Sequence, residues 1–128
     1  MTRTLLPDTD VLVDFLRGHG KAVAYVRNHA QKMVLSSIVV AELYAGVKGD
    51  EELRKLDRLV SLFPVLPVTP ELARAGGLYK RDFCRSHGVG LADAIIAATA
   101  ETHRVELKTL NTKHYPMLKG LKAPYTKK

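Results

Sequence analysis

Three acidic residues occupy positions where an unpaired charge would be costly. Asp8 follows a short apolar run at the expected carboxyl end of a first strand, where ligand sites of open α/β sheets gather. Glu42 shares one face of an expected helix with Ile38 and Ala45, and Asp93 lies early in an alanine-rich helix. An isolated buried carboxylate is unfavourable, so such groups are paired, protonated or bound to a cation. Asp8, Glu42 and Asp93 are therefore the candidate catalytic and metal-binding residues.

The chemistry that such a set favours is hydrolysis of a phosphodiester. Ligands that are all carboxylate oxygens select hard cations, which indicates Mg²⁺ or Mn²⁺. These ions keep several waters when few carboxylates hold them, and a nucleic acid phosphate would complete the shell. An ion in that position polarises the phosphodiester and activates water for in-line attack.

Each acid also has an ordinary structural explanation. Asp8 fits an Asx turn after Pro7. Asp93 fits a helix cap, because the helix dipole favours an acid in the first turn. Glu42 has the weakest alternative, since a mid-helix acid with apolar neighbours needs an ion pair with an arginine. The pattern alone leaves both explanations open for each residue.

The elements that must position these acids alternate along the chain. Apolar spacing and turn residues predict short strands at residues 4–6, 33–35 and 105–110, an extended stretch at 64–68, and helices at 10–17, 21–31, 38–47, 50–63, 70–86 and 91–102. Ser36 or Ser37 and Thr69 are expected helix caps. Gly76 and Gly77 inside a helix predict close packing against another element. This order indicates one α/β domain, residues 1–128, with a mainly parallel sheet.

The composition agrees with one compact, positively charged domain. The chain has 128 residues, 46% of them hydrophobic, and a formal net charge of +7. Residues 104–128 hold seven cations and one acid, and so carry most of that charge. A basic segment on a nearly neutral body favours a polyanionic partner, although a solvated tail is the equal alternative.

Cysteine content and hydropathy indicate the compartment. Cys84 is the one cysteine, which rules out an internal disulfide and a thiolate metal cluster. No leader-like segment and no apolar run long enough for a membrane span is apparent. We expect an intracellular, cytoplasmic protein that does not enter membranes.

Four segments together resemble one family. In chain order they are LLPDTDVLVD (residues 5–14), SSIVVAELYAG (36–46), LADAIIA (91–97) and TLNTKHY (109–115). The ordered set resembles the PIN-domain ribonucleases, and most closely the VapC toxins of toxin–antitoxin pairs. The resemblance implies a three-layer α/β/α sandwich with a mainly parallel central sheet, and an acidic, Mg²⁺- or Mn²⁺-dependent site that hydrolyses RNA.

The resemblance also implies roles for individual residues. Asp8, Glu42 and Asp93 match the three acids of the family site, with Asp8 and Asp93 contacting the metal and Glu42 acting directly or through water. Thr9, Thr109 and Asn111 match supporting polar residues, and Lys113 matches a phosphate contact; together the further positions implied are Thr9, Thr109, Asn111, Lys113 and His114.

One position departs from the family pattern. Many relatives carry a fourth acid two or three residues beyond Asn111, where this chain has Lys113 and His114. A second metal is therefore in doubt. His114 either binds phosphate or donates a proton, or it only packs beside Tyr115.

The family further implies partners. A VapB-type antitoxin would cover the acidic site with its C-terminal segment, and toxin subunits would form a homodimer. An apolar stripe on the helix at 50–63 is either that partner surface or core; its members are Leu53, Leu56, Leu59 and Val60.

Two other functions are weighed against the ribonuclease. A PIN-like module without the fourth acid would bind RNA without cutting it. The sequence Asp8-Thr9-Asp10-Val11 also fits the nucleophile motif of haloacid-dehalogenase-type phosphatases. Those enzymes need a downstream lysine, an acidic pair and generally a longer chain, and the adjacent acids of this chain, Glu51-Glu52, come too early and within a charged helix. Asp10 and Asp14 are one helical turn apart, and we expect them to be either supporting or surface acids.

Overall fold

Short parallel strands form the centre of the structure, a computed structural model that describes residues 3–127. Strand β1 (Leu5–Pro7) pairs in parallel with β4 (Glu106–Lys108), and β2 (Leu35–Ser36) pairs in parallel with β3 (Val65–Leu66). An isolated parallel bridge between Leu5 and Met33 joins the two pairs. The resulting order is β4-β1-β2-β3, and the expected parallel arrangement is confirmed.

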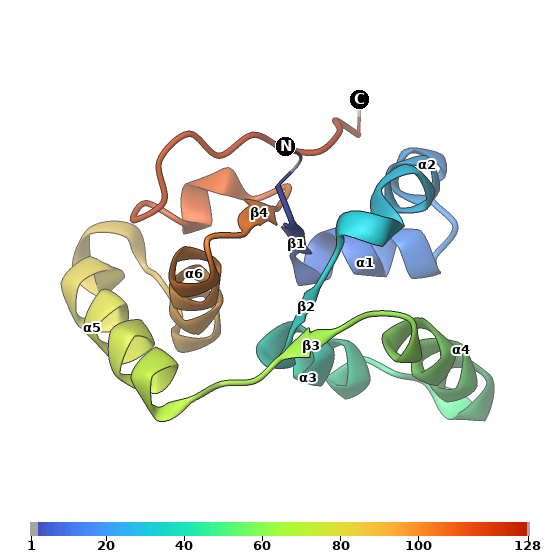
Figure 1. Cartoon of the computed structure of the whole chain (residues 1–128), viewed down its shortest axis with the longest axis horizontal. Helices are drawn as coiled ribbons and strands as arrows, with labels where there is room; N and C mark the ends of the chain where they lie inside the picture. The colour runs from blue at the N-terminus through green and yellow to red at the C-terminus, as the bar shows by residue number, and fades with distance from the viewer. Residues whose placement is uncertain (1–2, 128) are drawn as a thin grey trace.

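Helices cover both sides of the strands. Figure 1 shows α5 and α6 on one side and α1, α2 and α4 on the other, which confirms the expected α/β/α layers. The helices are α1 (Thr9–Leu16), α2 (Gly20–His29), α3 (Ser37–Ala45), α4 (Gly49–Ser61), α5 (Pro70–His87) and α6 (Leu91–His103), with 3₁₀ turns η1 (Ala30–Lys32) and η2 (Thr112–His114).

Side-chain hydroxyls cap the starts of α3 and α5. The Ser36 hydroxyl accepts from the backbone N–H of Ile38 at 3.1 Å, and the Thr69 hydroxyl accepts from that of Leu72 at 3.2 Å. Each satisfies a donor that the first turn leaves without a helical partner. The expected caps at Ser36 and Thr69 are confirmed.

Close packing of α5 on α6 fixes the helix that carries Asp93. A Cβ placed on Gly76 would lie 2.6 Å from the Cγ1 atom of Ile95, so only glycine fits at that crossing. Gly77 faces open space and has no such role. The predicted close packing is therefore confirmed for Gly76 alone.

Two expected features differ in the structure. The last strand ends at Lys108 rather than at residue 110, because Thr109 and the residues after it turn toward β1 and α1. In the stripe on α4, Leu56 and Leu59 are core residues, whereas Leu53 is 39% exposed. The stripe is therefore mainly core rather than a free partner surface.

Among the described residues, no helix has both the length and the apolar character that crossing a bilayer requires.

Candidate active site

Asp8 lies where β1 passes into α1. It caps α1 through Oδ1, which accepts the Thr9 backbone N–H at 2.8 Å. Oδ2 accepts the hydroxyls of Thr109 at 2.9 Å and Tyr115 at 2.8 Å. The side chain is buried at 7% exposure. Asp8 therefore caps α1 and also binds two residues from the far end of the chain.

Asp93 meets Asp8 from the first turn of α6. The N-cap of α6 is Gly90, without a side-chain cap, so capping does not explain Asp93. Asp93 Oδ1 lies 3.2 Å from the Tyr115 hydroxyl, and Oδ2 lies 3.7 Å from Nδ1 of His114. Burial and the nearby Asp8 charge raise the pKa of Asp93 above the usual 3.8. A cation beside this carboxylate would relieve both effects.

Glu42 is exposed, in contrast to the apolar setting expected for it. The buried residues of α3 are Val39 and Leu43, and Glu42 lies on the side that opens to solvent. Its Oε1 accepts the Thr9 hydroxyl at 2.6 Å. Thr9 thus links Glu42 to the helix that Asp8 caps.

One open cleft of ≈ 400 Å³ collects these residues. Five acids line it, against two permanent cations. The lining residues are Asp8, Thr9, Asp10, Val13, Asp14, Arg17, Glu42, Asp93, Asn111, His114 and Lys127. All three predicted acids share this cleft, and an excess of negative charge favours a bound cation.

Asp10 ties the loop after β4 to α1. Its Oδ2 accepts the Leu110 backbone N–H at 2.9 Å, the Asn111 amide at 3.1 Å and the Thr109 hydroxyl at 3.3 Å. Burial and the Asp8 charge raise its pKa, which these hydrogen bonds partly offset. The role that the sequence left open for Asp10 is to hold the loop that carries Thr109 and Asn111.

Tyr115 is a site residue that sequence reasoning missed. It is 1% exposed, its ring belongs to the core, and its hydroxyl reaches both Asp8 and Asp93. Burial and the two carboxylates raise the pKa of Tyr115 well above its usual range, so the hydroxyl keeps its proton and donates. The one available signal was a large aromatic residue at the end of an otherwise polar segment.

The two residues in the place of a fourth acid, Lys113 and His114, differ in their position relative to the cleft. Lys113 is exposed and is not among the residues that line the cleft. The His114 side chain is 61% exposed, lines the cleft and approaches Asp93. His114 therefore faces the cleft rather than the core.

Asp14 joins the C-terminal segment to the cleft. Lys127 Nζ lies 2.9 Å from Oδ1 of Asp14, and the Tyr125 hydroxyl donates to Oδ2 at 2.9 Å. Tyr125 also stacks on His19, with ring centroids 5.8 Å apart. Although burial acts in the other direction, these partners lower the pKa of Asp14. Residues 125–127 thus lie against α1, while Lys128 lies outside the described residues.

Asp8 and Asp93 are a pair of acids that fits a divalent ion, and Glu42 is a third acid outside that pair. Among residues 3–127, no group of three or more Asp, Glu, His or Cys side chains is placed to hold a metal ion together. Asp8 and Asp93 share a neutral donor, Tyr115, which leaves their charge uncompensated. Mg²⁺ commonly uses only one or two carboxylates, with waters and substrate phosphates as its other ligands. The donor set therefore fits Mg²⁺ or Mn²⁺.

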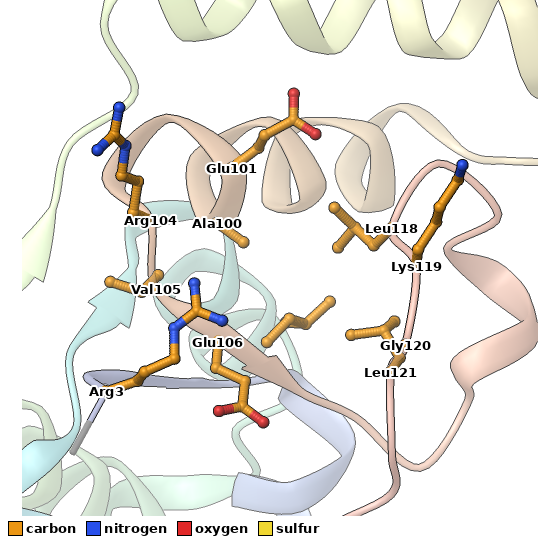
Figure 2. Close-up of a pocket in the computed structure, with 11 residues that line it drawn as sticks. Arg3, Ala100, Glu101, Arg104, Val105, Glu106, Leu118, Lys119, Gly120 and Leu121 are labelled. Atoms are coloured by element: carbon orange, nitrogen blue, oxygen red, sulfur yellow. The ribbon is translucent and has the colours of Figure 1, made fainter. Parts of the chain in front are cut away.

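A second hollow, of ≈ 310 Å³, lies at the other ends of β1 and β4 and does not offer such a pair. Figure 2 shows its two acids, Glu101 and Glu106, on different sides of the hollow. Glu101 accepts the Tyr79 hydroxyl at 2.5 Å, and Glu106 is paired with Lys108 at 2.7 Å. Each of these acids has its own partner, so the cleft around Asp8 is the better candidate.

Comparison with known proteins identifies the family to which the chain is similar. The chain matches the PIN domain family over residues 5–116. It is 38% identical over 124 residues to Ribonuclease VapC10 of Mycobacterium tuberculosis, covering 94% of this chain and 92% of the relative. Ribonuclease VapC19 of the same organism is also 38% identical, with 94% and 98% covered.

Solved structures of similar fold include a toxin–antitoxin complex from Klebsiella pneumoniae, with a TM-score of 0.81, 28% identity, and coverage of 94% of this chain and 98% of that one. FitAB bound to a DNA fragment gives a TM-score of 0.77 and 26% identity, with 95% and 96% covered. These matches confirm the resemblance seen in the four sequence segments. The chain belongs to the PIN domain family.

Proposed function

We propose that the protein is a metal-dependent endoribonuclease toxin of the VapC type, held inactive by a cognate antitoxin. The observation that carries the proposal is the acidic cleft, in which Asp8 and Asp93 share one neutral hydroxyl donor. The proposed reaction is based on the relatives that are named ribonucleases. The proposed control by a partner is based on the solved toxin–antitoxin complex.

Asp8 and Asp93 would hold Mg²⁺ or Mn²⁺, with Glu42 as a third ligand or bound through water. When bound, such an ion supplies charge stabilisation at the phosphodiester and a more acidic water. Thr9 orients Glu42, while Thr109 orients Asp8. These hydrogen bonds fix the carboxylates before RNA arrives, which preserves their geometry during the reaction.

The cations near the cleft suit a phosphate chain. Arg17 and Lys127 lie on its lining beside the exposed His114 side chain, and Lys113 lies on the exposed surface beyond. Each phosphate that these cations neutralise releases counterions, which adds affinity without sequence preference. Asn111 lies on the same lining as a polar contact. We assign Arg17, Lys113, His114 and Lys127 to substrate binding.

The basic C-terminal segment, residues 104–128, belongs to the same unit in this proposal. Tyr125 and Lys127 contact Asp14 of α1, which supports one PIN-like unit over residues 1–128. The partner would be a VapB-type antitoxin, and the FitAB–DNA structure suggests that such complexes also bind DNA. A homodimer and a cytoplasmic location stay predictions.

A non-catalytic RNA-binding module is the second candidate. The observation that favours it is the exposed Lys113 and His114 at the place of a fourth acid. The phosphatase hypothesis is set aside, because the matched family is the PIN domain and because Oδ2 of Asp10 is occupied by donors from the loop after β4.

The deciding experiment is cleavage of a labelled pool of structured RNAs by antitoxin-free protein, with Mg²⁺, with Mn²⁺ and with a chelator. The Asp8→Asn/Asp93→Asn double variant is the inactive control. Glu101→Gln is the matched control, since Glu101 is an acid of the same helix as Asp93 that bonds Tyr79 instead. Discrete cuts by wild type and Glu101→Gln, only with metal, support the ribonuclease. Tight binding without cuts under either metal supports the binding module.

A further inference from the structure

Tyr115 contacts both acids that are proposed to hold the metal. Its hydroxyl lies 2.8 Å from Oδ2 of Asp8 and 3.2 Å from Oδ1 of Asp93. These acids come from separate elements, the end of β1 and the first turn of α6. Among the contacts described for residues 3–127, the Tyr115 side chain is the one that reaches both carboxylates.

The ring holds this hydroxyl in place. Tyr115 is 1% exposed and packs in the hydrophobic core. Its backbone N–H donates to the carbonyl of Thr112 at 3.2 Å, and its carbonyl accepts from Leu118 at 3.0 Å. Anchored on both sides, the hydroxyl cannot follow a carboxylate that moves, so it fixes the position of both.

A neutral donor between two acids has a different effect from a cation. A phenol has a single proton, which it shares between the two carboxylates, and it removes neither charge. Three of the roughly four acceptor positions of Asp8 are used, by Thr9, Thr109 and Tyr115, which leaves about one for a ligand. The oxygen of Asp93 that does not face Tyr115 is Oδ2.

We propose that Tyr115 is a positioning residue that sets the separation of Asp8 and Asp93 for a divalent cation. The inference rests on the proposed metal site, but not on RNA cleavage. Tyr115 orients the ligating carboxylates from behind, and a partner of this kind typically contributes ten- to a hundredfold to metal affinity.

The test compares Tyr115→Phe with Tyr79→Phe. Both changes remove one hydroxyl that bonds a carboxylate, but the Tyr79 hydroxyl bonds Glu101, away from the cleft. Mn²⁺ binding is measured by calorimetry without RNA, and thermal unfolding is measured in chelator. The concentration of Mn²⁺ that gives half-maximal RNA cleavage is measured as well.

We expect Tyr115→Phe to bind Mn²⁺ about tenfold more weakly, with cleavage restored at high Mn²⁺, and Tyr79→Phe to bind as wild type does. A structural role alone would lower the unfolding temperature of Tyr115→Phe and leave Mn²⁺ affinity unchanged, which overturns the inference. Weaker Mn²⁺ binding in a protein whose wild type cuts no RNA keeps the inference and removes the proposed ribonuclease activity.

A second measurement covers the case in which Tyr115→Phe does not fold. Wild-type protein is labelled with fluorotyrosine, and its ¹⁹F resonances are assigned by replacing the other tyrosines one at a time (Tyr25, Tyr44, Tyr79 and Tyr125). The Tyr115 resonance is expected to shift on titration with Mg²⁺, while that of Tyr79 stays in place. A Tyr115 resonance that does not respond to Mg²⁺ overturns the inference.

Discussion

Asp14 and Asp93 line the same cleft but have opposite kinds of partner. Asp14 accepts from the Lys127 ammonium group and the Tyr125 hydroxyl, both at 2.9 Å. Its charge is matched by a permanent cation, and its pKa lies below the ordinary value although burial acts to raise it. Asp14 is a satisfied structural acid.

Asp93 has a hydroxyl and a histidine instead. The Tyr115 hydroxyl lies at 3.2 Å and Nδ1 of His114 at 3.7 Å. Burial and the charge of Asp8 raise the pKa of Asp93, and these two partners offset that rise only in part. The ionised carboxylate is therefore less favourable in the metal-free protein than it is in water.

The difference shows that Asp14 has a structural role, whereas the Asp8–Asp93 pair is arranged to attract a cation. The C-terminal segment is held by the ion pair between Lys127 and Asp14, which compensates the charge of Asp14. The Asp8–Asp93 pair is placed accurately by neutral hydroxyls but is left short of positive charge, so a cation from solution gains most there. Reduced stability at a functional site is the expected cost of that arrangement.

The largest predicted effect is on cleavage by Asp93→Asn. Replacing a ligating carboxylate removes several kcal/mol of transition-state stabilisation, so we expect the rate to fall by about a thousandfold or more. Single-turnover cleavage of the RNA identified in the pool measures it. RNA binding should persist, because the amide reduces repulsion of phosphate. Cleavage at the wild-type rate would remove Asp93 from the site.

A smaller effect is predicted for the basic C-terminal segment. Changing Lys119, Lys122 and Lys127 to Gln should weaken RNA binding by about tenfold and reduce the salt slope by about 2, at roughly 0.7 per lost phosphate contact. The triple variant Lys48→Gln/Arg54→Gln/Lys55→Gln, on and next to α4, is the charge-matched control. Equal salt slopes for the two triple variants would make the segment an ordinary solvated one.

Asp14→Asn is expected to act on stability. Losing the charged hydrogen bonds to Lys127 and Tyr125 should lower the free energy of unfolding by about 1–2 kcal/mol, since Lys127 is partly exposed and its contribution is screened. Urea unfolding at neutral pH in chelator measures this. A stability equal to that of wild type would show that the C-terminal segment is not fastened through Asp14.

The subtlest prediction concerns pH, where the two acids should differ in sign. The folded pKa of Asp14 is lowered, so its contribution is present above the ordinary carboxyl pKa of 3.8 and is lost as pH falls through the lowered value. The folded pKa of Asp93 is raised, so metal-free stability falls as pH rises from 3.8 through the raised value.

Unfolding of three proteins in chelator across that pH range checks the sign. The stability advantage of wild type over Asp14→Asn should grow with pH. Asp93→Asn should gain stability relative to wild type as pH rises. Parallel pH profiles for the two variants would contradict the contrast between the acids.

Local rules were enough to predict the framework of the site. Strand–helix alternation predicted the parallel sheet, and the parallel ends of β1 and β4 bring Asp8 beside Thr109. Glycine spacing predicted the close crossing at Gly76 that fixes the helix of Asp93. These features depend on neighbours in sequence or on regular geometry, so they were predictable.

Long-range partners could not be predicted in the same way. Tyr115 is buried because the loop after β4 folds back onto the core, and no local period encodes that return. Tyr125 and Lys127 lie in a segment without helix or strand, so their contacts with Asp14 were not predictable. The exposure of Glu42 reflects an open cleft, which helical spacing alone does not reveal.

The most direct test of the central claim is Mn²⁺ binding to wild type, Asp93→Asn and Asp14→Asn, measured by calorimetry on metal-free protein without RNA. The account predicts that wild type and Asp14→Asn bind Mn²⁺ with the same affinity and that Asp93→Asn loses the binding. Equal binding by wild type and Asp93→Asn, or an equal loss in both variants, would contradict it.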